Sequence, residues 1–365
     1  MTAQPVAWDL AERVAVRVGG REPFGDSYHV DSLLPDFEEL TREAEDLVAA
    51  ETGLVSASGP ARVRVTDRAG WVHANVRSFQ RLLAPLTERF GDKLAASRVA
   101  STVTRNVAGV ELGSMLGWMS TRVLGQYDLL LVEGEDVGSG EVGDPDDQDI
   151  VYYVGPNVLA LEKRFGFPPR EFRLWLALHE VTHRAQFTGV PWLRPHFISL
   201  VDGVLGSVEP DPGHLLGAVR HAVEQMRAGQ NPLDDGGVVA LFASPEQREV
   251  LDKVSGMMSL LEGHGDVTMD RAGAGRVPSA ERFSRVLRAR RANRPGVAKL
   301  VQKVVGLEAK LKQYELGERF IETVESEGGS ALLARVWDGP ELLPSMAEIR
   351  DPFAWIARVG SVTSV

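Results

Sequence analysis

The chain has 365 residues, of which 44% are hydrophobic and 25% are charged, and it contains no cysteine. This composition is typical of a globular protein and excludes a disordered, collagen-like or disulfide-stabilised chain, a cysteine nucleophile and a sulfur-ligated metal. The formal net charge of −11 argues against a protein that binds nucleic acid through its phosphates.

The first 125 residues predict helices. Residues 1–12 lack the basic start and apolar stretch of a signal peptide, and no long apolar run follows, so we expect a cytoplasmic protein without membrane contacts. Apolar residues at three- and four-residue spacing predict helices over 31–51, 71–90 and 103–123, the last of them largely buried. Alternation around Val63 and Val65 predicts a short strand.

The hydrophobic period then changes to that of a sheet. Residues 127–132 and 150–154 are compact apolar runs of strand length, rich in β-branched and aromatic side chains. Between them, residues 133–149 are rich in glycine and acidic side chains and contain neither lysine nor arginine. The spacing of an EF-hand calcium loop is absent, so this stretch is interpreted as a solvated loop.

Three further helices are predicted by their ends. Pro168 and Pro169 open a helix to about Phe187. A capping box at Ser244 starts one that continues to about His264, and residues 297–326 form a long amphipathic stretch. We therefore expect a mainly α (α+β) fold, with a small β element ahead of the helix at Pro168.

The helix at Pro168 contains the motif H-E-x-x-H in residues 179–183. Residues four apart lie on one helix face, so His179 and His183 can both bind one Zn²⁺ at about 2.0–2.1 Å. Glu180 lies about 100° further round the helix. It is therefore expected to act as a general base on a water beside the ion. Two structural histidines without a metal are the alternative, although burying them unpartnered in this apolar helix is costly.

A hydrolytic zinc site needs a third protein ligand. Gln186 and Gly189 stand where the long metzincin motif requires glycine and histidine, which excludes that class. The best acidic candidate is Glu262, where Gly263 permits close approach of another helix. Asp266, four residues later, is expected to accept a hydrogen bond from a ligand histidine. The remaining histidines are alternative ligands: His196, His214, His221 and His264, with His29 and His73 far upstream.

The residue that stabilises an oxyanion or contacts substrate stays open. His264 and Tyr314 are candidates, as is a group of arginines between residues 282 and 294. For the arginines, a solvated helix face is the favoured interpretation. The sequence does not indicate an oligomeric state.

These motifs resemble a known family. H-E-x-x-H followed at a distance by E-G-x-x-D is similar to the gluzincin arrangement, and the wider chain is similar to the zincin-like metallopeptidase type 2 family of largely actinobacterial zinc hydrolases. The blocks that carry the resemblance are residues 67–75, 123–128, 179–187, 260–266, 306–317 and 351–355. Two features depart from the pattern: the spacing from His183 to Glu262 is longer than in compact gluzincins, and Arg184 stands where an uncharged residue is usual.

The resemblance implies a zincin-like fold with extensive added helices, one catalytic zinc, and a peptide or protein substrate. It also implies an edge strand beside the metal, for which residues 150–154 are the candidate, a plain hairpin being the alternative. We expect three consecutive regions: an N-terminal helical region (1–125) packing on the catalytic core, a zincin-like catalytic region (126–275) and a C-terminal helical region (276–365).

The hypothesis from the sequence is a zinc metallopeptidase in which His179, His183 and Glu262 bind zinc and Glu180 is the general base. The alternative is a non-catalytic protein, either a pseudo-peptidase or a helical binding protein stabilised by zinc. The two differ in the number of protein ligands, because structural zinc sites are closed by four and catalytic sites keep an open position.

Overall fold

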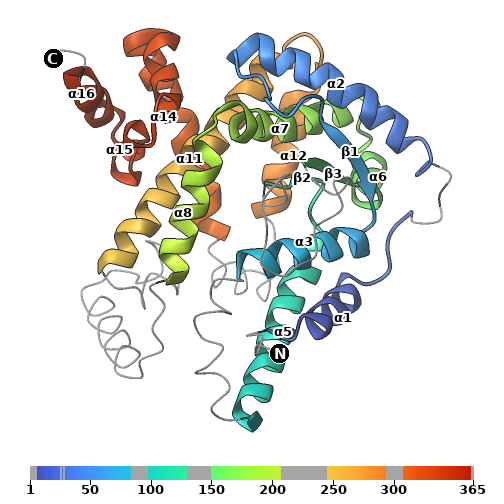
Figure 1. Cartoon of the computed structure of the whole chain (residues 1–365). Helices are drawn as coiled ribbons and strands as arrows, with labels where there is room; N and C mark the ends of the chain where they lie inside the picture. The colour runs from blue at the N-terminus through green and yellow to red at the C-terminus, as the bar shows by residue number, and fades with distance from the viewer. Residues whose placement is uncertain are drawn as a thin grey trace. The chain divides into compact units, whose positions relative to one another are not determined.

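The structure, a computed structural model, describes residues 6–24, 27, 29–83, 98–129, 149–206, 245–292 and 307–362. The described chain is mainly helical with one small sheet (Figure 1), which confirms the mainly α (α+β) prediction. It divides into two compact units, Met1–Gly189 with Thr268–Phe283, and Val190–Val267 with Ser284–Val365. Neither unit is one continuous stretch, so the units do not coincide with the three consecutive regions, which stay a prediction.

The first unit contains the sheet and the helix with the H-E-x-x-H motif. Its elements are α1 (Trp8–Gly19), α2 (Leu33–Thr52), β1 (Arg62–Thr66), α3 (Arg68–Leu82), α5 (Arg98–Ser120), β2 (Gly125–Tyr127), β3 (Ile150–Val154), α6 (Gly155–Phe165) and α7 (Pro169–Gly189). The end of α11 (Pro245–Ala272) and the start of α12 (Ala280–Ala292) also belong to it.

The sheet has the order β1-β3-β2, with β1 parallel and β2 antiparallel to β3. All five residues of β3 are buried, and Tyr153 stacks on Phe37 of α2 with ring centroids 3.8 Å apart. Because β3 is the central strand, the expectation that residues 150–154 offer an edge is wrong. The outer strands of the described sheet are β1 and β2. Residues 130–148, with nearly all of the acidic stretch 133–149, lie outside the described residues.

Helix α7 begins at Pro169 and ends at Gly189, as its proline and glycine punctuation predicts. Its first turns pack in an aromatic cluster in which Phe172 lies 4.9 Å from Phe167 and 5.2 Å from Phe283, measured between ring centroids. Arg173 is buried there and donates two hydrogen bonds to Glu162, of 2.8 and 3.0 Å. These contacts fix the helix rigidly before the H-E-x-x-H motif begins.

Helices α1 and α5 pack closely because both present small residues at four-residue spacing. A Cβ atom at Gly113 would overlap the carbonyl oxygen of Ala11. The residues in this contact are Gly109, Gly113 and Gly117 of α5, opposite Ala7, Ala11 and Ala15 at the start of α1. The prediction that α5 is largely buried is wrong on its other face, where Val107 is 50% exposed and Val110 44%.

The second unit contains helices and turns but no strand in its described part. It contains α8 (Leu193–Gly206), most of α11, α14 (Leu307–Ala334), the short 3-10 turns η2 (Arg335–Trp337) and η3 (Pro340–Leu342), α15 (Met346–Arg350) and α16 (Pro352–Val362). Its core gathers around Phe320 and Trp355. Helix α11 continues past His264, its predicted end, to Ala272. At Gly263 it approaches α14 so closely that a Cβ atom there would overlap the backbone of Gly317.

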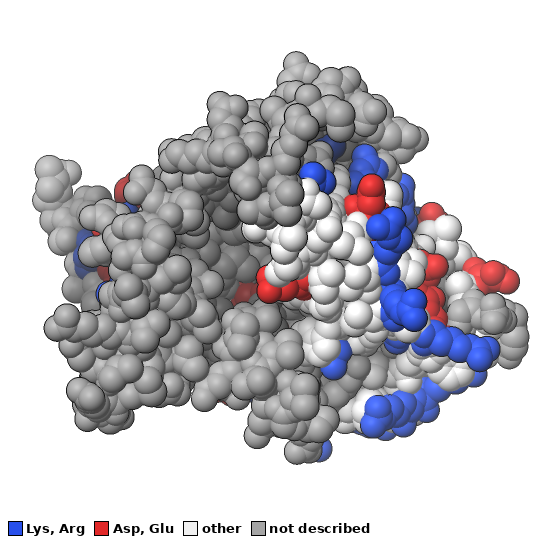
Figure 2. All heavy atoms as spheres, turned by 90° about the horizontal axis from the view of Figure 1, so that it is seen from below, with Lys and Arg blue, Asp and Glu red and all other residues white. Residues whose placement is uncertain are grey.

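Within the described residues, no helix has both the length and the apolar character needed to cross a lipid bilayer. On the face shown in Figure 2, lysine and arginine side chains gather in a band with aspartate and glutamate side chains beside them. Charges of both signs therefore mix over the part of this face that the structure describes.

Candidate active site

His179 and His183 lie one turn apart on α7 and direct their Nε2 atoms at each other. The two Nε2 atoms are 3.3 Å apart, and the rings are nearly perpendicular, at 85°. Two nitrogen ligands at about 2.0–2.1 Å from a tetrahedral zinc ion are themselves about 3.3–3.4 Å apart. The spacing of the imidazoles therefore fits two adjacent corners of one zinc site, as the H-E-x-x-H spacing predicts.

His183 has a partner that the sequence analysis did not anticipate. Its Nδ1 atom lies 3.0 Å from Oε1 of Gln186, three residues further along α7, and the Gln186 side chain is completely buried. The sequence signal was the i, i+3 spacing, which places the two side chains on one face. Gln186 entered the sequence analysis only as a reason to exclude metzincins.

Glu180 is 7% exposed and lies against β2. The backbone N–H of Tyr127 donates to its Oε2 atom over 3.1 Å. Leu124 and Asp128, the residues that flank β2, bond through their backbones to β3. Backbone groups alternate along an antiparallel strand, so those of Gly125 and Tyr127 face away from β3, toward Glu180.

Gly125 makes this approach possible. A Cβ atom at this position would lie 2.7 Å from Oε1, 2.8 Å from Cγ and 2.9 Å from Cδ of Glu180. These distances are well inside ordinary contact, so any larger residue displaces either the carboxylate or the strand. The glycine and the Tyr127 N–H together define where the carboxylate of Glu180 lies.

Strand β2 is held in turn by α3. The indole N–H of Trp71 donates to Oε1 of Gln126 over 2.8 Å, and Gln126 Nε2 donates to Asn75 Oδ1 over 3.1 Å. Asn75 Nδ2 completes the circuit by donating to the Trp71 carbonyl over 2.9 Å. Two of the sequence blocks that resemble the family, residues 67–75 and 123–128, therefore contribute side chains that position the strand beside Glu180.

Tyr153 lies near enough to Glu180 for the two groups to interact electrostatically. Burial raises the pKa of its hydroxyl far above the ordinary value; the hydrogen bond with Thr41 opposes this, and the charge of Glu180 adds to it. The Tyr153 hydroxyl lies 2.9 Å from the hydroxyl of Thr41, a residue of α2. Tyr153 therefore stays neutral at physiological pH and acts as a packing residue.

Arg184, the charged residue that departs from peptidase signatures, has a structural role. Its side chain is 1% exposed and donates to Asp149 over 2.6 Å, to Glu45 over 2.8 Å and to the carbonyl of Gly59 over 2.8 Å. A buried charge is tolerated when it is paired and hydrogen-bonded in this way. Burial raises the pKa of Glu45. The hydrogen bond from the Ala61 N–H and the charge of Arg184 lower it, but only in part. The arginine therefore ties α2 and the start of β3 to α7.

The remaining candidates lie in the second unit. Glu262 is buried and Asp266 half-buried, both on α11, which persists long enough to carry the two carboxylates one turn apart. His264 is buried, with its ring edge-on to Trp337 at 5.1 Å between centroids. Tyr314 falls within α14, but its side chain lies outside the described residues. The roles assigned to these four residues stay predictions.

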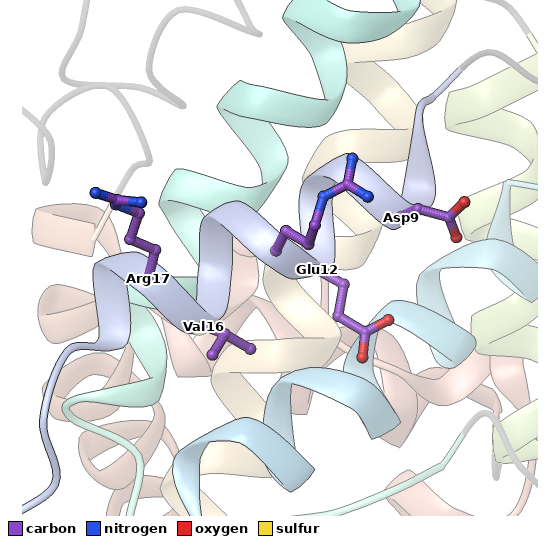
Figure 3. Close-up of a pocket in the computed structure, with 5 residues that line it drawn as sticks. Asp9, Glu12, Val16 and Arg17 are labelled. Carbon is purple, nitrogen blue, oxygen red and sulfur yellow. The ribbon is translucent and has the colours of Figure 1, made fainter.

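A surface depression of about 520 Å³ lies elsewhere, on α1. Among the described residues, those that line it belong to this one helix and include Asp9, Glu12 and Arg17, and Figure 3 shows their side chains pointing to different sides of it. A carboxylate oxygen of Glu12 lies 3.0 Å from Nδ1 of His73. The sequence analysis singled out none of these described lining residues for chemistry.

A helix carrying H-E-x-x-H, with both imidazoles set for one ion and the intervening glutamate held beside an outer strand, is the arrangement of the zincin class of metal-dependent hydrolases. The chain belongs to the zincin-like metallopeptidase family, whose profile matches residues 6–356. The family resemblance found in the sequence is thereby confirmed, and the family implies a metal, typically zinc.

A solved structure is also similar over nearly the whole chain. It is the crystal structure of a "putative hydrolase with a novel fold" from Chloroflexus aurantiacus, with a TM-score of 0.69 and 28% sequence identity. The match covers 97% of this chain and 99% of that one. No curated protein matches the chain. The family and this neighbour support a hydrolase-like role.

Proposed function

We propose that the protein is a zinc-dependent metallopeptidase in which His179, His183 and Glu262 bind the metal and Glu180 is the general base. The observation that carries the proposal is the 3.3 Å separation of the two Nε2 atoms, with Glu180 beside them on the same helix. A set of two imidazoles and one carboxylate is the ligand set of many hydrolytic zinc sites, which leave one position open.

The choice of Glu262 as third ligand is supported by the continuity of α11. The helix runs unbroken from Pro245 to Ala272, and its end belongs to the first unit, where Gly273 contacts Leu178 of α7. The long sequence gap before Glu262 is thus compatible with a single site.

Zinc, when bound, would acidify a water molecule and polarise a carbonyl group. Proton transfer and positioning are the task of the residues of the chain. Glu180 accepts a proton from the attacking water and returns it to the leaving amine. The Tyr127 N–H holds one oxygen of this carboxylate in place. Gln186 holds the ring of His183.

A peptide is the substrate class that the sheet favours. Strand β2 is an outer strand, and the carbonyl groups of Gly125 and Tyr127 face away from β3, on the side of Glu180. An extended peptide binds such an edge through main-chain hydrogen bonds, which puts its scissile bond in the neighbourhood of the general base.

The test is the variant Glu180→Gln, with Glu171→Gln on the same helix as its matched control. We expect Glu180→Gln to keep one zinc per chain, by elemental analysis, and to lose about 10²–10⁴-fold in the rate of cleavage of a peptide library. Glu171→Gln should cleave at the wild-type rate. Unchanged cleavage by Glu180→Gln refutes the mechanism. No cleavage by the zinc-loaded wild type, with or without chelator, favours the non-catalytic alternative.

A further inference from the structure

We propose that Gln186 is a positioning residue that holds His183 in the tautomer with its proton on Nδ1, so that the Nε2 lone pair is the one available to the metal. The inference deepens the proposed function and rests on it. It starts from the 3.0 Å contact between Nδ1 of His183 and Oε1 of Gln186.

The chemistry of the two groups fixes the direction of this hydrogen bond. An amide oxygen only accepts, so Nδ1 of the imidazole must donate to it. A neutral imidazole carries one proton, and a proton on Nδ1 leaves Nε2 as the acceptor and metal ligand. Nε2 is also the atom that lies 3.3 Å from Nε2 of His179. The contact with Gln186 therefore selects the tautomer, and the contact with His179 is compatible with it.

Burial makes the constraint rigid. Gln186 is 0% exposed and lies on the same helix as His183, so neither the backbone nor the amide can swing away without opening the packing around α7. The sequence analysis expected a carboxylate, Asp266, to orient a ligand histidine. On α7 an amide does this for His183, which orients the ring without adding a negative charge beside the metal.

The tautomer is measured directly in the metal-free wild-type protein. Nitrogen-15 spectra of labelled histidines, assigned with the variant His183→Asn, should show His183 with a protonated Nδ1 and an unprotonated Nε2. An Nε2–H tautomer overturns the inference. This measurement needs no bound metal, so it decides the inference separately from the zinc content of the wild type, which decides the proposed function.

The affinity for zinc gives the second measurement, by competition with a chromophoric chelator. Gln186→Met removes the acceptor at similar volume, and we expect about 10–100-fold weaker binding. Gln186→Glu keeps an acceptor and should bind within about threefold of wild type or tighter. Gln80→Met, the same change at an exposed position of α3, is the control and should have no effect. Wild-type affinity in Gln186→Met, or equal losses in both Gln186 variants, overturns the inference.

Discussion

Substituting Gly125 by alanine tests whether β2 positions Glu180. The added Cβ atom would lie 2.7–2.9 Å from three atoms of the Glu180 side chain, where ordinary contact begins at 3.4 Å. The two groups must therefore separate by about 0.5–0.7 Å, and overpacking of this kind costs about 1–3 kcal/mol. Because the Tyr127 N–H ties the carboxylate to the same strand, the displacement moves the general base itself.

The assay is urea unfolding followed by tryptophan fluorescence, arranged as a double-mutant cycle with Glu180→Ala. Truncating Glu180 removes the three atoms that the new methyl group meets, so the cost of Gly125→Ala should nearly vanish in that background. Gly360→Ala on α16, where the new methyl group meets open space, is the matched control and should be neutral or slightly stabilising.

The same variant has a kinetic consequence. Misplacing a catalytic group by about 1 Å can cost about 10²-fold, so we expect kcat of Gly125→Ala to fall by about 10–100-fold with zinc affinity within about threefold of wild type. A Gly125→Ala protein as stable and as active as wild type would refute the reasoning. So would an equal loss of stability in the presence and absence of the Glu180 side chain.

Two further predictions concern parts of the fold away from the histidines. Gly113→Ala should lower the free energy of unfolding by about 1–3 kcal/mol, because the new methyl group overlaps the carbonyl of Ala11. The measurement is a urea titration. A gain in stability, which helix propensity alone predicts, would contradict this reasoning. Burial raises the pKa of Glu348, but the hydrogen bonds from Arg358 and Ser345 and the charge of Arg358 together outweigh it, so the net pKa is lowered. Its stabilising effect is therefore full above the ordinary carboxyl pKa and is lost as pH falls through the folded value. The stability difference between wild type and Glu348→Gln should be largest at neutral pH and shrink in acid; a pH-independent difference would show that ionisation of Glu348 is not responsible.

The sequence predicted the features that depend only on neighbouring residues in the chain. Helix α7 starts at Pro169 and ends at Gly189, because proline and glycine set its ends without help from the rest of the chain. The spacing of His179 and His183 follows from helix geometry alone. These features needed no knowledge of tertiary contacts, and they include the two imidazoles and the glutamate on which the proposed function depends.

Tertiary packing decided what the sequence did not predict. Helix α11 was expected to end near His264 but continues to Ala272. Another helix does approach at Gly263, as the sequence analysis expected, and packing against Gly317 makes up for the poor helix propensity of glycine. Residues 150–154 were correctly predicted as a strand, but they were wrongly expected at the edge of the sheet. They form the central strand because they pair with β1 as well as with β2, and β1 is far away in the chain.

The supports of the candidate site were hidden for a related reason. Glu180 is held by a backbone N–H of Tyr127, and a main-chain donor leaves no mark in the sequence. Arg184 was noticed only as a departure from the family pattern, because its partners Asp149 and Glu45 come from distant segments. Gln186 could have been found, since its spacing from His183 is that of one helical turn.

The pairing of β1 with β3 limits how the chain can be dissected. A fragment starting at residue 126 would retain α7 and most of β2 but would lack β1, leaving β3 unpaired on the side that β1 occupies. It would also lack Glu45, a partner of buried Arg184. The smallest autonomously folding piece that carries the H-E-x-x-H helix must therefore include the amino-terminal segments, and shortening the protein for crystallisation or expression should begin elsewhere.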